Sequence, residues 1–201
     1  EVLFNKRFSN RWDIIASYVY SKTKGTIDNT WAADIGWGSR SGMNYGDPNY
    51  WTNADGYATY DPTHMIKIQG TYLIPYAEIS LSAYFRGVTG TSWNQRFRTR
   101  PLPQGRVTFN TEPKGDRHYP MEKILDLRLE KIFTLAKKYR LGLIVDVFNV
   151  FNVDTITSWG TRIGYDWLLP TDPDYYQSTG GHALYAITRP RQARLGIRLI
   201  F

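Results

Sequence analysis

Hydrophobic and polar residues alternate along seven stretches of the chain. A period of two residues is typical of β-strands that turn one side to an apolar environment and the other to a polar one. The predicted strands are residues 1–8, 11–22, 63–75, 77–89, 123–135, 139–151 and 191–201. No window of similar length has a helical period with capping residues, so the sequence predicts an all-β, antiparallel fold.

Each predicted strand has one apolar side and one polar, often charged, side. Strands of a parallel α/β sheet are buried on both sides and read as continuous apolar runs, so that class is disfavoured. In a soluble β-sandwich the apolar sides would face each other, and the charged sides would face water. In a transmembrane β-barrel the apolar sides would face lipid, and the charged sides would line the lumen. The alternation alone does not separate these two architectures.

The lengths of the connections do separate them, because short and long connections alternate strictly. The short ones are residues 9–10, 75–76 and 136–138, and the long ones are residues 23–61, 90–122 and 152–185. All long connections therefore leave the same end of the sheet. Short turns at one end and long loops at the other are typical of outer-membrane barrels. Soluble domains rarely carry several loops longer than about 15 residues, so the sequence predicts a transmembrane barrel.

Aromatic residues mark both ends of the predicted lipid-facing side. The predicted membrane-interface residues are Trp12, Tyr18, Tyr20, Tyr72, Phe133 and Phe151. Tryptophan and tyrosine also favour β-sheets in general, but the mid-strand positions on this side are mostly aliphatic, which favours an interfacial girdle. Lys131 is the charged exception, and it lies close enough to a turn for its amine to reach the interface.

Composition and charge exclude several classes of protein. The 201 residues include 25 Lys and Arg against 18 Asp and Glu, a net charge of +7, and 15% are aromatic. Aromatic content of this order argues against disorder, and the apolar runs are far shorter than the roughly 18 residues of a membrane-spanning helix. The absence of cysteine excludes disulfide scaffolds, zinc fingers and thiol catalysis.

Charged residues on the predicted lumen side change sign from strand to strand. They are Asp13, Lys67, Glu78, Arg86, Asp126, Arg128, Glu130, Arg140, Asp146, Arg194 and Arg198. This pattern predicts cross-strand ion pairs and contact with a polar plug. A transport path along some of these residues is the alternative interpretation.

Several motifs together resemble the TonB-dependent outer-membrane receptors. Residues 146–152 end a strand in Asn-Val-Phe-Asn, one hairpin before the end of the chain, as in the barrels of that family. Residues 191–201 resemble the terminal signal that the barrel-assembly machinery reads, and the predicted assembly-signal residues are Leu195, Ile197, Leu199 and Phe201. Residues 5–10 and 124–131 are similar to other strands of these receptors.

The resemblance implies a barrel of 22 strands around an N-terminal plug, energised through TonB and located in the bacterial outer membrane with the long loops outside. Residues 1–201 are then expected to be the C-terminal part of the barrel domain, with the plug and earlier strands absent. Seven strands are an odd number, so residues 1–8 are expected to pair with a strand outside this sequence. The implied partners are outer-membrane lipid, lipopolysaccharide, the remaining strands and the plug, the TonB system and the barrel-assembly machinery.

Ligand-binding signals lie in the long connections. The predicted ligand contacts are Trp31, Trp37, Tyr50, Trp51 and Tyr57 in the first and Arg96, Arg98 and Arg100 in the second. The aromatic rings suit stacking on a sugar or an aromatic ligand, or else they pack the loop against its neighbours. The arginines suit an anionic ligand or lipopolysaccharide phosphate. A nucleic-acid partner is not expected, because no nucleic-acid-binding fold accompanies the basic run.

No catalytic constellation is present in the sequence, so no enzyme activity and no cofactor are expected. The histidines His64, His118 and His182 are scattered without metal-ligand spacing. Loop aspartates Asp47, Asp55 and Asp61 suit either calcium or, as the preferred interpretation, ordinary turns.

Three functional hypotheses remain at this point. The first is a receptor barrel for TonB-energised uptake of a siderophore, oligosaccharide, peptide or similar ligand. The second is a plug-less porin or a structural outer-membrane barrel. The third is a soluble β-sandwich that binds carbohydrate through its aromatic loop.

Overall fold

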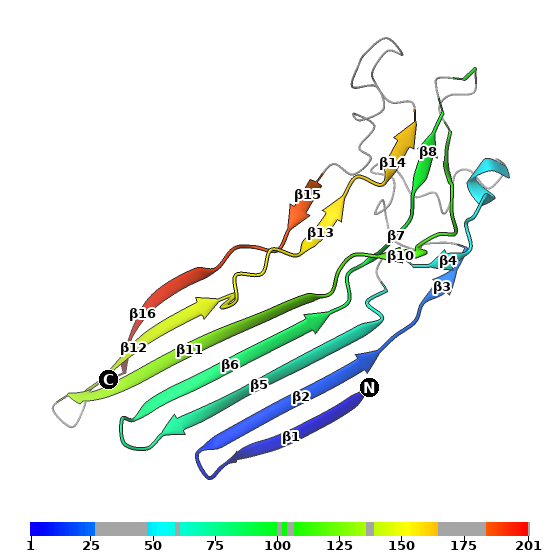
Figure 1. The fold of residues 1–201 in the computed structure, drawn as a ribbon. Coiled ribbons are helices and arrows are strands. Elements are labelled where there is room, and N and C mark those ends of the chain that lie inside the picture. The colour runs from blue at the N-terminus through cyan, green and yellow to red at the C-terminus, as the bar shows by residue number, and fades with distance from the viewer. Residues whose placement is uncertain are drawn as a thin grey trace.

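A computed structural model describes residues 1–26, 48–58, 61–99, 102–103, 107–135, 139–164 and 184–200. Seven long strands form one sheet in which every strand pairs antiparallel with its neighbours (Figure 1). They are β1 (Val2–Ser9), β2 (Trp12–Tyr20), β5 (His64–Ile74), β6 (Ile79–Val88), β11 (Glu122–Leu135), β12 (Tyr139–Phe148) and β16 (Gln192–Ile200). The order β1-β2-β5-β6-β11-β12-β16 is a simple meander. The all-β, mostly antiparallel class is therefore confirmed, and the seven long strands overlap the seven predicted stretches.

Two of the short turns show why the chain reverses where it does. Asn10 and Arg11 both have positive φ, 52° and 73°, at the turn between β1 and β2. Two central residues with positive φ make the turn whose twist matches that of a β-hairpin. The turn lies one residue later than predicted. Between β5 and β6 the turn ends at Glu78, with φ 50°. The turn between β11 and β12 falls outside the described residues.

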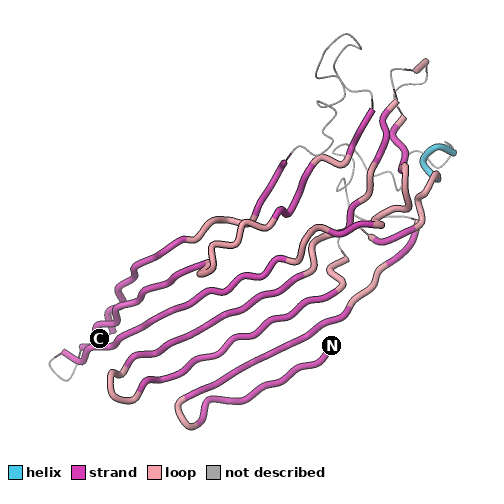
Figure 2. The backbone as a smooth tube through the Cα atoms, in the orientation of Figure 1, coloured by secondary structure: helices cyan, strands magenta, loops and turns pink. Residues whose placement is uncertain are grey.

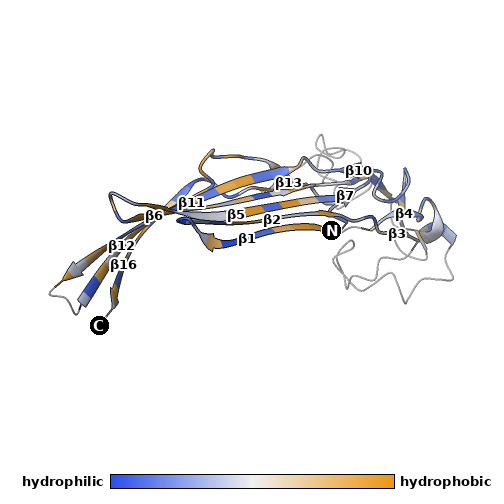
Figure 3. Cartoon of the chain, turned by 90° about the horizontal axis from the view of Figure 1, so that it is seen from below, coloured by the Kyte–Doolittle hydropathy of each residue, from blue (hydrophilic) through white to orange (hydrophobic). Residues whose placement is uncertain are grey.

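The sheet is a single layer whose strands alternate between hydrophobic and hydrophilic residues (Figure 3). No described residue in its middle is a buried hydrophobic one. The buried hydrophobic residues of the described chain are Ala54, Val88, Val107 and Tyr119, at or beyond the loop ends of the strands. Large hydrophobic residues on the sheet, such as Leu129 and Leu143, are exposed instead. The fold therefore has its core at the loop end and two uncovered faces in the sheet.

The long connections contain secondary structure that the sequence did not reveal (Figure 2). The elements are β3 (Lys24–Gly25), η1 (Pro48–Trp51), β4 (Gly56–Tyr57), β7 (Ser92–Trp93), β8 (Arg96–Arg98), β9 (Thr108–Asn110), β10 (Arg117–His118), β13 (Ile156–Trp159), β14 (Arg162–Gly164) and β15 (Leu184–Ile187). The pairs are β3–β4, β7–β10, β13–β15 and β8–β9, all antiparallel, and β14 joins β8 in parallel. Strands of two to four residues are too short for a period to be detected.

The described parts of the three long connections lie at the same end of the sheet, as predicted from their order (Figure 1). Within the described part of the chain, no helix has the length and apolar character needed to cross a bilayer.

Candidate functional site

The main sheet has one apolar face, which is continuous from strand to strand. Direct cross-strand pairing aligns Trp12, Tyr72, Leu81, Leu129, Val145 and Leu195 in one row. We call the side that carries this row the apolar face and the opposite side the polar face. Directly paired residues share a face, so the register keeps the two sets of side chains apart over the whole sheet.

At the turn end, the apolar face carries aromatic rings next to cations. The amine of Lys6 lies 3.7 Å from the centre of the Trp12 ring and donates to the carbonyl of Trp12 at 2.9 Å. The amine of Lys131 donates to the carbonyl of Ala77 in the β5–β6 turn. Lys131 therefore reaches the turn end of the sheet, as predicted, instead of leaving its charge in the middle of the apolar face.

The loop end of the apolar face carries a second aromatic group. The hydroxyl of Tyr18 lies 2.8 Å from Nδ1 of His64, and the Tyr20 ring packs on the same imidazole with centroids 5.4 Å apart. Tyr72 and Phe133 lie on the turn-end half, as predicted. Phe151 does not lie on a strand, because β12 ends at Phe148 and Phe151 lies in the turn beyond it.

The conformation and hydrogen bonds of Asn149 explain why β12 ends before Phe151. Asn149 is buried, and its φ of 51° is incompatible with continuing a strand. Its side-chain amide donates to the carbonyls of Val153, at 2.9 Å, and Arg189, at 2.8 Å. Its side-chain oxygen accepts from the backbone amide of Val153 at 2.9 Å. The predicted strand was three residues too long because asparagine at this position forms a turn.

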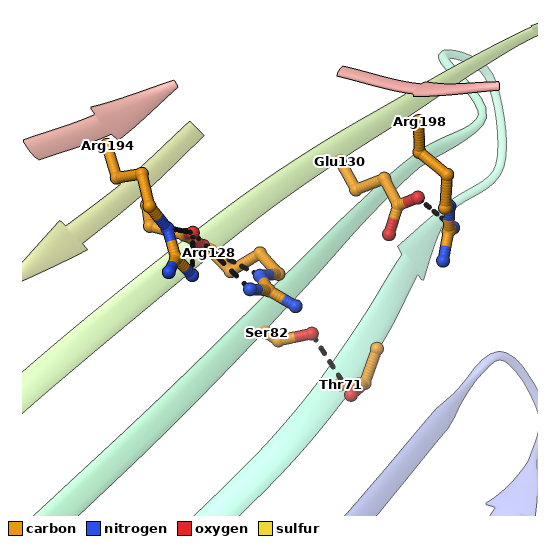
Figure 4. A network of polar contacts seen from close by, with 7 residues as sticks. Thr71, Ser82, Arg128, Glu130, Arg194 and Arg198 are labelled. Atoms are coloured by element: carbon orange, nitrogen blue, oxygen red, sulfur yellow. Dashed lines mark hydrogen bonds and ion pairs between the residues drawn. The ribbon is translucent and has the colours of Figure 1, made fainter. Parts of the chain in front are cut away.

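The polar face carries cross-strand ion pairs, as predicted from the alternating charges (Figure 4). Arg128, Asp146 and Arg194 are directly paired on adjacent strands. The carboxylate of Asp146 accepts from Nε of Arg128 at 2.6 Å and from Nη2 of Arg194 at 2.7 Å. The Arg86 guanidinium contacts Glu122 at 2.7 Å. The sign does not alternate everywhere, since Lys67 lies directly opposite Arg86.

A second ion pair crosses an intervening strand. Glu130 of β11 and Arg198 of β16 contact each other over β12. Gly142 of β12 makes this possible, because a Cβ added there would lie 3.3 Å from Oε1 of Glu130 and 3.6 Å from Cβ of Arg198. Glycine at this position thus leaves the space in which the two charged side chains meet.

Replacing Gly142 by valine is expected to separate Glu130 from Arg198. Valine favours strands, so the variant alone would mix a gain in strand propensity with the loss of the pair. The informative quantity is the difference between G142V in the wild-type protein and G142V in an R198Q background. For a half-exposed pair, a coupling free energy of about 0.5–1 kcal/mol is expected from urea unfolding in detergent. Equal effects in both backgrounds would contradict this role of Gly142.

Parts of the three long connections pack together at the loop end; we call these described segments the loop platform. Trp93, Tyr119 and Trp159 pack as a trio with ring centroids 5.1–5.8 Å apart. The hydroxyl of Tyr119 donates to the carbonyl of Trp159 at 3.3 Å. Arg117 lies 5.1 Å over Trp93 and pairs with Glu112 at 2.7 Å. The second and third connections are thereby joined through an aromatic core.

Amide side chains join the first connection to the second. The side-chain amide of Asn94 donates to Oδ1 of Asn110 at 2.9 Å, and the backbone amide of Gly115 donates to Oδ1 of Asn94 at 3.1 Å. Asn53 and Asn110 exchange two bonds from their side-chain amides to each other's backbone carbonyl, at 3.1 and 3.2 Å. Asn94 and Asn110 are buried, and buried amides must be satisfied, so this network stabilises the platform as a folded unit.

The predicted ligand contacts are distributed over different parts of the platform. Trp51 lies in η1 and is 42% exposed. Tyr57 is half-buried, with its ring against His118 and the amine of Lys24 4.3 Å above it. Trp31, Trp37, Arg100 and the side chain of Tyr50 lie outside the described residues.

Two of the predicted arginines share one face of a small sheet. Arg96 and Arg98 are alternate residues of β8, and the parallel partner of Arg96 is Arg162 of β14. Arg96 also donates to Oγ1 of Thr161 at 3.3 Å. Arg162 was missed from the sequence because nothing in its own stretch of chain indicates that β14 pairs with β8.

The predicted assembly-signal residues lie on the last strand of the sheet. Leu195, Ile197 and Leu199 are 81%, 74% and 67% exposed on the apolar face. Phe201 lies outside the described residues. Only β12 pairs with β16 in the described chain, so these leucines and isoleucine are uncovered on the edge of the sheet.

The described residues contain no group of three or more His, Cys, Asp or Glu side chains that would hold a metal ion. Asp55 is exposed, whereas Asp61 is 1% exposed and lies before β5. Asp47 and His182 fall outside the described part.

No protein-family model matches the chain. No curated protein matches its sequence. Among solved structures, the chain is similar to the ferric-catecholate import receptor Fiu from E. coli K12 in a closed form, with a TM-score of 0.47 and 14% sequence identity. The match covers 98% of this chain and 19% of that receptor chain, so the chain spans about a fifth of its length.

Proposed function

We propose that the main sheet is part of the wall of an outer-membrane β-barrel, and that the barrel belongs to a receptor for TonB-energised uptake of a ligand. The observation that carries the proposal is the contrast between the two faces of a single-layer sheet. One face is uncovered and apolar, with cations confined to its ends, and the other is polar and ion-paired. Lipid on one side and a filled lumen on the other satisfy both faces.

Strand lengths support a membrane-spanning role. β2, β5, β6, β12 and β16 contain 9–11 residues, and β11 contains 14. Tilted strands of about 9–11 residues cross the hydrocarbon core of a bilayer. The aromatic groups around Trp12 and around His64 lie near opposite ends of such strands, where membrane interfaces attract amphipathic rings.

Strand direction supports a larger barrel. β1 and β16 both run from the loop end to the turn end, because five antiparallel strands lie between them (Figure 1). Closing the sheet on itself would therefore pair them in parallel. Antiparallel closure needs an odd number of further strands, and a bilayer does not tolerate open edges. The proposed barrel of 22 strands would supply fifteen, since 22 − 7 = 15.

The loop platform is the proposed ligand-binding part, outside the membrane. Trp51 is 42% exposed, and Arg96, Arg98 and Arg162 lie at neighbouring positions of β8 and β14. Guanidinium groups bind carboxylate or phosphate oxygens in pairs. The ligand class that fits both features is an anionic molecule with an aromatic or sugar ring.

The membrane location is tested through Trp12. In liposomes with brominated lipids, the wild-type full-length protein is expected to lose fluorescence relative to normal lipids, because the bromine quenches a ring at the interface. W12F is expected to reduce that quenching by the part that Trp12 contributes, whereas W51F leaves it unchanged. Absence of quenching by brominated lipids in the wild-type protein would contradict the barrel proposal and favour the soluble sandwich.

The conductance of the full-length protein in planar bilayers tests separately whether the barrel is that of a plugged receptor or of an open pore. A barrel filled by a plug conducts little, whereas a plug-less porin conducts strongly. High steady conductance would reject the receptor and retain the barrel.

A further inference from the structure

In the described strands, every Lys, Arg, Asp or Glu that cross-strand pairing places on the apolar face is a lysine. These residues are Lys6 near the turn end of β1, Lys131 near the turn end of β11 and Lys123 at the loop end of β11. The polar face, in contrast, carries both signs in ion pairs such as Arg86 with Glu122. None of the described ion pairs includes a lysine of the apolar face. The charge of the apolar face is therefore positive and lies at its two ends.

The backbone stays extended beyond the end of β2. The backbone amide of Ser21 donates to the carbonyl of Thr63 at 3.0 Å, and that of Ala58 donates to the carbonyl of Thr23 at 3.0 Å. β3 follows shortly after β2 and continues its course (Figure 1). Side chains therefore keep alternating between the two sides from β2 into β3.

This alternation brings two further lysines to the side of the apolar face. Tyr18 and Tyr20 lie on that face, so Lys22 and Lys24, at the next alternate positions, lie on the same side. Tyr57 is the direct partner of Lys24, and the amines of both lysines lie over its ring. Both lysines are exposed. They thus continue the apolar face beyond its loop-end aromatic group.

The two amines converge on one aromatic ring. The amine of Lys22 lies 5.6 Å and that of Lys24 4.3 Å from the centre of the Tyr57 ring, so the amines are no more than about 10 Å apart, the sum of the two distances. Tyr57 is itself held in place, because its ring packs edge-on against His118. None of the described ion pairs includes either lysine. Two ammonium groups this close repel each other, and an anion between them stabilises both.

The height of these lysines above the apolar face indicates where the anion comes from. Strands rise about 3.3 Å per residue and are tilted by about 40° in a barrel, so Lys22 and Lys24 lie about 5 and 10 Å beyond Tyr20 along the bilayer normal. The headgroup region extends about 5–8 Å beyond the hydrocarbon on each side, and interfacial tyrosines mark its inner edge. Because lysine stems are flexible, both amines reach lipid phosphates in this layer.

A lipid fits this position better than a soluble ligand does. Lys22 and Lys24 lie on the side of the apolar face, whereas a ligand in the lumen would meet the polar face. Lys123 is exposed and lies in the same cross-strand row as Tyr18, three strand spacings or about 14 Å away along the rim. A small soluble anion would contact one of these positions, whereas a layer of lipid headgroups contacts both.

We propose that Lys22 and Lys24, held over Tyr57, form a binding site for the phosphate group of an anionic lipid in the leaflet at the loop end. The proposal rests on the proposed function in one respect, namely that the apolar face lies in a bilayer. The two amines donate hydrogen bonds to the phosphate oxygens, and the acyl chains of the lipid lie along the apolar face below Tyr20. A lipid bound in this way fastens the base of the loop platform to the membrane surface.

The site is tested by lipid binding to the full-length protein in detergent, measured by native mass spectrometry. The probes are phosphatidic acid and diacylglycerol with the same acyl chains, which differ only in the phosphate group. The wild-type protein is expected to bind phosphatidic acid more tightly than diacylglycerol. K22Q/K24Q is expected to bind phosphatidic acid about 25-fold more weakly, since each lysine at an anionic lipid surface contributes about fivefold. K67Q, the matched control, removes a lysine of the polar face and is expected to keep the wild-type affinity.

Equal affinity of wild type and K22Q/K24Q for phosphatidic acid, or equal affinity of wild type for the two lipids, would overturn the proposal. K22R/K24R keeps both charges and is expected to retain binding; a loss as large as that of K22Q/K24Q would also contradict the site. Glycerol phosphate at millimolar concentration is expected to leave the lipid bound, and displacement of the lipid would assign the lysines to a soluble anion instead. None of these outcomes changes the quenching of Trp12, so failure of this site and failure of the barrel proposal are distinguishable.

Discussion

Replacing Asn149 by alanine is expected to lower the free energy of unfolding by about 3–5 kcal/mol, one of the two largest effects in this sheet. The asparagine side chain satisfies the carbonyls of Val153 and Arg189 and the amide of Val153. Alanine would leave these groups buried without partners, at about 1–3 kcal/mol each when no water replaces the bond. Alanine is also disfavoured at the φ of 51°, which adds about 1 kcal/mol. Urea unfolding of the full-length protein in detergent measures the change.

Two further variants separate the causes. N149G keeps the backbone geometry without strain and loses the same hydrogen bonds, so it is expected to be about 1 kcal/mol more stable than N149A. N152A removes one exposed bond, from the backbone amide of Arg191 to Oδ1 of Asn152, and it also places alanine at a positive φ of 53°. The two costs together are expected to be about 1–2 kcal/mol. If N149A and N152A cost the same, Asn149 is not the organiser of this turn.

The hydrogen bonds of this turn give a physical reason for the Asn-Val-Phe-Asn motif at residues 149–152, which the sequence analysis identified only by its resemblance to a family. The backbone amide of Asn149 donates to Oδ1 of Asp126 of β11 at 2.8 Å, so the turn is fastened to the neighbouring strand. The contact with Arg189 fastens it to the segment that enters β16. The motif therefore joins β11, β12 and β16 where the sheet meets the loop platform. Spacing alone could not show this, because Asn149 and Arg189 are forty residues apart.

The long strands were predictable because one side of each strand is apolar and the other polar over eight or more residues. β16 is the clearest case, with Leu195, Ile197 and Leu199 against Arg194 and Arg198. Such a pattern is local, so the sequence contains all of it. The ends were less predictable: β12 stops at Phe148, where a positive φ at Asn149 overrides the continuing hydrophobic pattern.

The loop platform was not predictable, because its contacts join residues far apart in the chain. Trp93, Tyr119 and Trp159 come from two connections and form one cluster. Arg96 and Arg162 are neighbours only because β8 and β14 pair in parallel. No periodic pattern encodes such contacts. Tyr57, which the sequence offered as a ligand contact, packs against His118 from the second connection.

The ion-paired group of Arg128, Asp146 and Arg194 stands between these cases. Its members were identified as lumen-side charges from alternation alone, and the sign change from strand to strand predicted that they would pair. The stoichiometry of two arginines to one aspartate depends on the register of β11, β12 and β16. A period of two residues predicts which face a residue lies on, but it does not distinguish between registers that differ by two residues.

Replacing Leu129 by arginine is expected to destabilise the protein in a bilayer by about 2–4 kcal/mol, the cost of a charge on the lipid-facing side at mid-depth. Leu129 lies near the middle of β11 on the apolar face and is exposed. L135R places the same charge at the turn end of the same strand, where about 0–1 kcal/mol is expected because the side chain reaches the interface. Lys131 already uses that route by contacting the carbonyl of Ala77.

The comparison with the polar face makes the test specific to lipid. Gln69 is an exposed mid-strand residue of β5 on the polar face, opposite Ile15 and Tyr84. Q69R is expected to change stability by no more than about 0.5 kcal/mol, because residue 69 is exposed on the face that carries the charged residues. The stability loss is expected to decrease in the order L129R, L135R, Q69R only if hydrocarbon covers the apolar face. If water covered that face, none of the three variants would be destabilised strongly. If a second sheet packed on it, L129R and L135R would both be destabilised. Equal losses for L129R and L135R, measured by unfolding in liposomes, would therefore contradict a membrane on this face.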